Sequence, residues 1–213
     1  MDSSHLNKLL FESIKQILKE ETQGVDQFIE ELSKKYPMSE ELKEFTRKAI
    51  VDSGCQKIEF NNLNMGLGVA LHDKVIINKK VLSLGLEQIL FIVFHELAHQ
   101  WQYKKYGKEK MYEFYLGEID GLEAAKFMLT VENVADQFGI RKIREAQQKN
   151  LIDKSFVPKG AYDNVTVDYI KQMLDYFKKE IDKKQIKNSE QLSEYMYNKL
   201  TMTLFDKAMG IFK

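Results

Sequence analysis

The residues most able to do chemistry are five consecutive positions, His95-Glu96-Leu97-Ala98-His99. The two histidines stand at i and i+4, so on a helix they lie on one face, one turn apart, where both imidazoles can bind one metal ion. Glu96 is rotated off the metal and can hold a water bound to it. This is the HExxH arrangement of zinc peptidases, which supplies two ligands and a general base.

The sequence around this motif favours a buried helix. Apolar residues surround the helix axis almost completely: Leu86, Ile89, Leu90, Ile92, Val93, Phe94, Leu97, Ala98 and Trp101. A helix of this kind packs inside a domain, and Gly107 is a suitable residue to end it. A glutamate is rarely buried there unless it is paired or binds a ligand. The context therefore predicts a metal site.

Catalytic zinc takes three protein ligands and keeps a fourth position for water, so one ligand must come from elsewhere. No histidine follows His99, and Gln102 and Lys105 stand where the metzincin extension requires Gly and His. The upstream candidates are His5, His72 and Cys55. A downstream carboxylate is the economical choice and gives a site of two histidines and one glutamate.

Two downstream carboxylates compete, Glu118 and Glu132, and the surroundings of Glu132 favour it. Glu132 and Asp136 are at i and i+4 of one helix face, and Ala135 is small enough to let this helix approach the metal helix. Asp136 would then accept the free ring N–H of His95 or His99 and fix the orientation of that ligand.

Together these motifs resemble those of gluzincin-type zinc metallopeptidases. Glu132-x-x-Ala135-Asp136-x-x-Gly139 resembles the third-ligand helix of the HtpX-like membrane peptidases, and it is similar to the helix that follows HExxH in ImmA/IrrE-type peptidases. The run from His95 to Trp101 resembles the metal helix of the gluzincin aminopeptidases, whose spacing would point to Glu118 instead. The resemblance covers roughly residues 57–145 and implies a zincin-like core.

The chain also departs from these families. It shows no membrane span, unlike the HtpX-like enzymes, and no DNA-reading module, unlike many ImmA-type proteins. It has no downstream histidine to serve as the transition-state donor of thermolysin-like enzymes. Tyr162, in a predicted loop, is a candidate for that role, and Tyr103, Tyr106 and Tyr169 compete with it.

Composition narrows the function classes. The 213 residues carry 32 Lys+Arg and 32 Asp+Glu, so the net charge is zero and no nucleic-acid partner is expected. The longest clean apolar run, residues 89–94, is far shorter than the ~20 residues of a membrane helix. The N-terminus does not read as a secretory signal, and the single cysteine fits a reducing compartment. These features predict a cytoplasmic protein.

Periodicity and the scarcity of proline predict an α+β fold that is mainly α. The resemblance to gluzincins implies that its core is zincin-like. Helices are expected at residues 4–21, 24–35, from a Ser39 N-cap to about Val51, 86–106, 109–129, 132–147, 165–183 and 188–208. A strand at residues 57–60 and a hairpin at 65–78 predict a short antiparallel sheet packed on the metal helix. We expect an N-terminal helical cap (1–55), a metallopeptidase core (56–150) and a C-terminal helical segment (151–213) that follows a loop over residues 151–164.

The sequence therefore predicts a zinc-dependent metallopeptidase with a peptide or protein substrate. His95, His99 and Glu132 are the expected ligands of Zn2+, Glu96 is the expected general base, and Asp136 is expected behind a histidine. The alternative is a catalytically restricted or inactive zincin-fold protein that binds or cleaves one specific protein partner.

Overall fold

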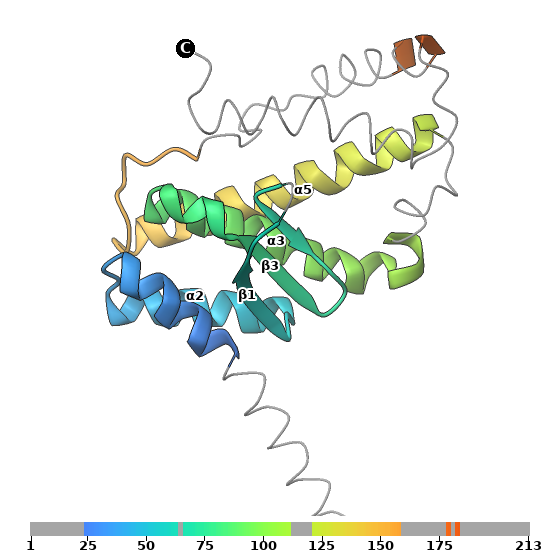
Figure 1. The fold of residues 1–213 in the computed structure, drawn as a ribbon. Coiled ribbons are helices and arrows are strands. Elements are labelled where there is room, and N and C mark those ends of the chain that lie inside the picture. Colours follow the sequence, from blue (N-terminus) through green and yellow to red (C-terminus); the bar gives the residue numbers. More distant parts are fainter. Residues whose placement is uncertain (1–23, 64–65, 112–120, 159–177, 180–181, 184–213) are drawn as a thin grey trace, which may run out of the picture.

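The computed structural model describes residues 24–63, 66–111, 121–158, 178–179 and 182–183 (Figure 1). The fold is α+β and mainly α, as predicted. Its elements in chain order are a helix at residues 24–35, α2 (Glu40–Ser53), β1 (Lys57–Asn61), β2 (Gly68–Ala70), β3 (Lys74–Asn78), the 3-10 helix η1 (Lys79–Ser83), α3 (Leu86–Tyr106) and α5 (Gly121–Gln148). The helices expected at 4–21 and 188–208, and nearly all of that at 165–183, lie outside the described residues. Within the described part of the chain, no helix is both long and apolar enough to cross a membrane.

The helices before the sheet begin and end close to where the sequence predicts. The helix at residues 24–35 stops ahead of Pro37, and the side chain of Ser39 accepts a hydrogen bond from the backbone N–H of Leu42 at the start of α2. This N-cap satisfies a backbone donor that the first turn of a helix leaves unpaired. α2 continues two residues past the expected end at Val51, to Ser53.

The sheet is mixed, which corrects the prediction of an antiparallel sheet. Its strand order is β1-β3-β2; β2 and β3 form the predicted antiparallel hairpin, but β1 runs parallel to β3 on the other side. The chain therefore goes from β1 to the opposite edge of the sheet past the end of β3, because Asn61 and Gly68 pair with Asn78 and Ile77. Buried Asn78, at the end of β3, holds this connection by donating from its amide to the carbonyls of Leu63 and Gly66.

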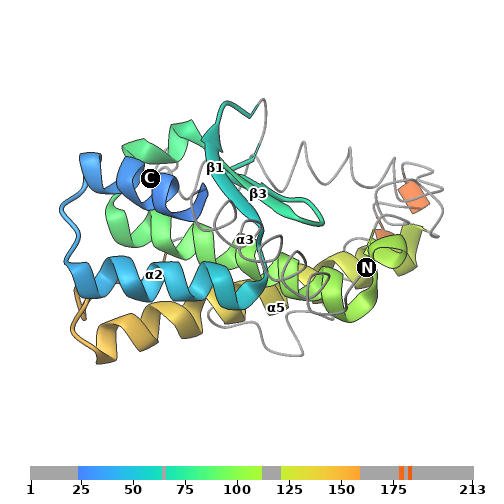
Figure 2. The same cartoon turned by 90° about the horizontal axis from the view of Figure 1, so that it is seen from below.

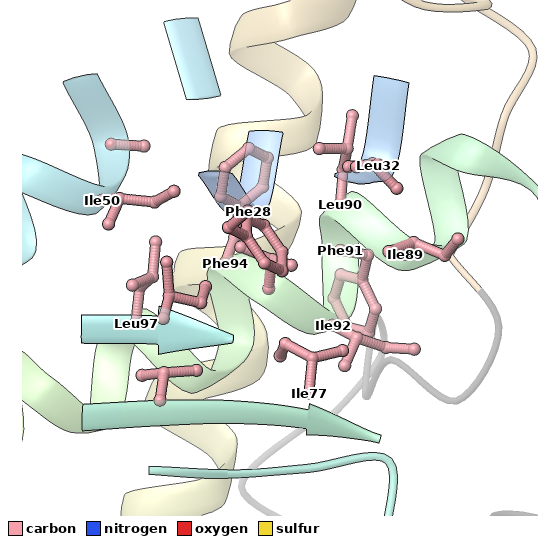
Figure 3. Packing of buried hydrophobic residues seen from close by; sticks show 14 of the residues in the cluster. Phe28, Leu32, Ile50, Ile77, Ile89, Leu90, Phe91, Ile92, Phe94 and Leu97 are labelled. Atoms are coloured by element: carbon pink, nitrogen blue, oxygen red, sulfur yellow. The ribbon is translucent and has the colours of Figure 1, made fainter. Parts of the chain in front are cut away.

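Helix α3 lies between the sheet and α5 and contacts both, with α2 beside it (Figures 1 and 2). Its first half is buried on all sides, as the sequence predicts, and Gly107 ends it with a positive φ of 86°. The main core fills the space between α3, the sheet and the N-terminal helices, and includes Phe28, Leu32, Ile50, Ile77 and Phe94 (Figure 3). Trp101, expected among the buried residues, is 46% exposed, although its neighbours Gln100 and Gln102 in α3 are buried.

Helix α5 contains the end of the helix expected at 109–129 and all of the helix expected at 132–147. Residues 108–111 are also helical, and residues 112–120 lie outside the described part of the chain. The expected boundary near residues 130–132 does not exist, since α5 runs from Gly121 to Gln148 without a break. The local sequence Leu129-Thr130-Val131-Glu132 contains neither Gly nor Pro, so nothing in it ends a helix. The described residues 151–158 after α5 are not helical, in agreement with the predicted loop.

Candidate metal centre

The close packing of α5 on α3 brings the two halves of the site together. Ala135 is fully buried, and a Cβ atom added to Gly139 would lie 2.9 Å from the ring of Phe91 and 3.3 Å from its backbone oxygen. The small residues thus let α5 approach the backbone of α3 one turn before the HExxH motif. The two turns of α5 that precede Gly139 present Asp136 and Glu132 to the histidines.

His95 and His99 of α3 and Glu132 of α5 form a group whose ligand atoms all lie within 4.8 Å of one another. The Nε2 atoms of His95 and His99 are 3.2 Å apart. Oε2 of Glu132 lies 3.2 Å from Nε2 of His95, and Oε1 of Glu132 lies 3.7 Å from Nε2 of His99. Ligands at ~2.0–2.2 Å around a tetrahedral zinc ion are about 3.3–3.6 Å apart. The donor set and its spacing therefore fit one divalent ion.

The outer ring nitrogens of both histidines also have buried partners. Asp136 Oδ1 lies 2.7 Å from His95 Nδ1, the contact expected of this aspartate from the sequence. Gln102 Oε1 lies 2.7 Å from His99 Nδ1, a contact that the sequence analysis does not anticipate. The signal was present in the sequence, since Gln102 stands three residues after His99 and hence on the same helix face. These contacts direct both Nε2 atoms toward Glu132.

The charges of the group suit a cation. Burial lowers the pKa of His95, but hydrogen bonds to Asp136 and Glu132 outweigh it and raise that pKa well above its usual value. Burial raises the pKa of Glu132, but His99 and His95 outweigh this effect and bring the pKa below its usual value. Glu132 is therefore ionised at neutral pH, and its side chain, 42% exposed, keeps one side of the site open to solvent.

Glu96 lies on α3 next to His95 and is 7% exposed. Burial raises the pKa of Glu96, and the imidazoles of His95 and His99 oppose that rise. A carboxylate with a raised pKa is a better proton acceptor near neutral pH than an exposed one. Strand β2 approaches it closely, because a Cβ atom added to Gly68 would lie 2.7 Å from Cγ and Oε1 of Glu96.

The other candidates from the sequence do not join this group or lie outside the described residues. His72 is exposed and packs edge-on against Tyr103. Cys55, which follows α2, is buried, and its thiol is directed to the carbonyl of Lys57. The hydroxyl of Tyr103 donates to the carbonyl of Ala70, and Tyr106 packs against Phe127. His5, Glu118, Tyr162 and Tyr169 lie outside the described residues.

Comparisons of the chain with protein-family models, with curated proteins and with solved structures found no match. The fold and the site by themselves define a mainly-α protein in which His95, His99 and Glu132, on two packed helices, could hold a metal ion.

Proposed function

We propose that this protein is a zinc-dependent metallopeptidase. The observation that carries the proposal is that Glu132, which follows His99 by 33 positions and stands on a separate helix, lies within ligand distance of both HExxH histidines. If the HExxH motif were present by chance, no third ligand would be expected beside its histidines. Two histidines and one glutamate that leave a solvent-facing side form the ligand set of an open catalytic site, whereas structural zinc sites are usually closed by four protein ligands.

Each residue of the site has a distinct task in this proposal. A zinc ion held by His95, His99 and Glu132 would lower the pKa of its water and polarise the peptide carbonyl. Glu96 accepts the proton of the attacking water and passes it to the leaving amine, for which its raised pKa is suited. Asp136 holds the ring of His95, so that Nε2 is directed at His99 and Glu132, where it would bind the ion.

The conservative substitution Glu96→Gln tests the proposal. Glu96 is not among the expected ligands, so the variant should bind zinc as the wild type does, and hydrolysis of a quenched fluorescent peptide library should fall by at least ~10²-fold. Zinc content is measured on the same samples by elemental analysis. Equal cleavage by wild type and variant contradicts the assignment of Glu96 as the base. Zinc binding without any cleavage favours the alternative of a protein restricted to one partner.

A further inference from the structure

Gln102 makes two hydrogen bonds that connect the helix of His99 to the helix of Glu132. Its Oε1 lies 2.7 Å from His99 Nδ1, and its Nε2 donates to the backbone carbonyl of Val131 at 2.7 Å. The side chain is fully buried, with 0% exposed. We propose that Gln102 is a positioning residue of the metal centre, which fixes the proton on His99 and holds Glu132 in register. This inference rests on the zinc site of the proposed function.

The direction of the two bonds follows from the chemistry of the groups. The carbonyl of Val131 can only accept, so the NH2 group of Gln102 must face it, and Oε1 must then face His99. An amide oxygen also only accepts, and Nδ1 of His99 must therefore carry the hydrogen. In a neutral imidazole this leaves the lone pair on Nε2, the atom directed at His95 and Glu132. Gln102 thus selects the form of His99 that can bind a metal.

The second bond acts on the third ligand. Val131 directly precedes Glu132 in α5. A hydrogen bond from Gln102 to the carbonyl of Val131 therefore fixes the position of Glu132 along α5 relative to α3. One side chain of α3 therefore sets the orientation of one ligand and the position of another, which lies 33 residues after His99 in the sequence. A disturbance at Gln102 should weaken both ligands together.

An amide suits this place better than a carboxylate. The centre already holds the carboxylates of Glu96, Glu132 and Asp136, and a further buried negative charge would require its own compensation. A glutamate at position 102 would also present an acceptor to the carbonyl of Val131 and lose that bond. The two histidines accordingly have unlike partners, an anion behind His95 and a neutral amide behind His99.

The experiment compares Gln102→Met with Gln100→Met in the full chain. Gln100 is a matched control, because it is also a buried glutamine of α3 whose amide donates to backbone carbonyls, those of Leu71 and Lys74. Its amide makes no hydrogen bond to either histidine. Zinc affinity is measured by competition with a chromogenic chelator. We expect Gln102→Met to lose ~10–100-fold in zinc affinity and Gln100→Met to keep that of the wild type.

A second readout reports the proton on His99 directly. In zinc-loaded protein labelled with 15N-histidine, the wild type should show a slowly exchanging Nδ1–H signal of His99, and Gln102→Met should lose it. Gln102→Glu keeps an acceptor for this proton but not the bond to Val131, so it should keep the signal while binding zinc more weakly. This variant also provides the test if Gln102→Met does not fold.

The outcomes separate the two proposals. A wild-type protein that takes up no zinc overturns the metal site and this inference with it. Zinc binding by the wild type together with equal affinities of Gln102→Met and Gln100→Met overturns the role of Gln102 alone. A zinc-loaded wild type in which His99 carries its proton on Nε2 also overturns it, because the bond to Gln102 requires the proton on Nδ1.

Discussion

Gly68 on β2 lies directly against the carboxylate of Glu96, so the substitution Gly68→Ala perturbs the proposed base with a single methyl group. The new Cβ atom would lie 2.7 Å from Cγ and Oε1 of Glu96 and 2.8 Å from its Cδ, where ordinary contacts begin at 3.4 Å. Gly68 has no positive φ, and alanine therefore adds bulk without backbone strain. The carboxylate must retreat by at least ~0.7 Å, because the backbone of β2 is held by its pairing with β3.

This displacement sets the expected magnitude. A misplacement of about 1 Å in a catalytic group costs on the order of 10²-fold in rate, so kcat/KM for peptide cleavage should fall by roughly that factor. The free energy of unfolding should fall by about 1–3 kcal/mol, because the new methyl group is forced against the buried side chain of Glu96. Zinc affinity should stay that of the wild type, since Gly68 faces Glu96 and not the proposed ligands.

The assay measures peptide cleavage, zinc affinity and urea unfolding on the same preparations. Gly24→Ala is the matched control, because a Cβ atom added at Gly24 meets nothing within 4 Å. It should behave as the wild type in peptide cleavage and zinc affinity, and its free energy of unfolding should rise by no more than about 1 kcal/mol, because Gly24 lies in a helix. Full activity of Gly68→Ala would refute the reasoning, since the carboxylate could then move without loss. A loss of zinc by this variant would assign the strand to the metal site instead of the base.

Three further predictions concern the metal and the buried thiol. Zinc at 100 times its Kd should stabilise the protein by ~2.7 kcal/mol and raise the Tm by about 5–10 °C in a thermal scan, and a chelator should reverse the shift. Glu132→Gln should lower zinc affinity by more than the ~10–100-fold cost of losing an outer partner, as chelator competition will show; wild-type affinity contradicts its role as a ligand. Burial raises the pKa of Cys55 to about 11 from 9.0, so its contribution to stability is complete below pH 9 and is lost as the pH rises through 11. Between pH 8 and 10.5 the free energy of unfolding, measured with urea, should therefore fall by about 2 kcal/mol more in the wild type than in Cys55→Ala. An equal fall in both proteins would contradict the raised pKa of Cys55.

Much of the site could be predicted from the sequence because its parts are local. The spacing of His95 and His99 requires only a helix, and the apolar residues around them predict one. The sequence favours Glu132 because its neighbours Ala135 and Asp136 suit a helix that packs closely on the metal helix. The structure brings Glu132 within ligand distance of both histidines, while Glu118 lies outside the described residues.

The remaining features depend on tertiary contacts that no local pattern contains. Ile58 and Phe60 alternate with polar residues in the same way whether β1 pairs parallel or antiparallel, so the pattern could not give the direction of the strand. The contact of Gly68 with Glu96 depends on the position of the sheet over α3. Gln102 shares a helix face with His99, but its second partner, the carbonyl of Val131, becomes visible only once α5 is placed.

The most direct test of the metal site is an anomalous difference map from crystals of the zinc-loaded protein, recorded on both sides of the zinc absorption edge. We predict one strong peak about 2.0–2.2 Å from Nε2 of His95, Nε2 of His99 and a carboxylate oxygen of Glu132. A peak bound by another set of residues, with Glu118 in place of Glu132, would contradict the assignment of the third ligand. The absence of any peak between the two histidines would contradict the metal centre itself.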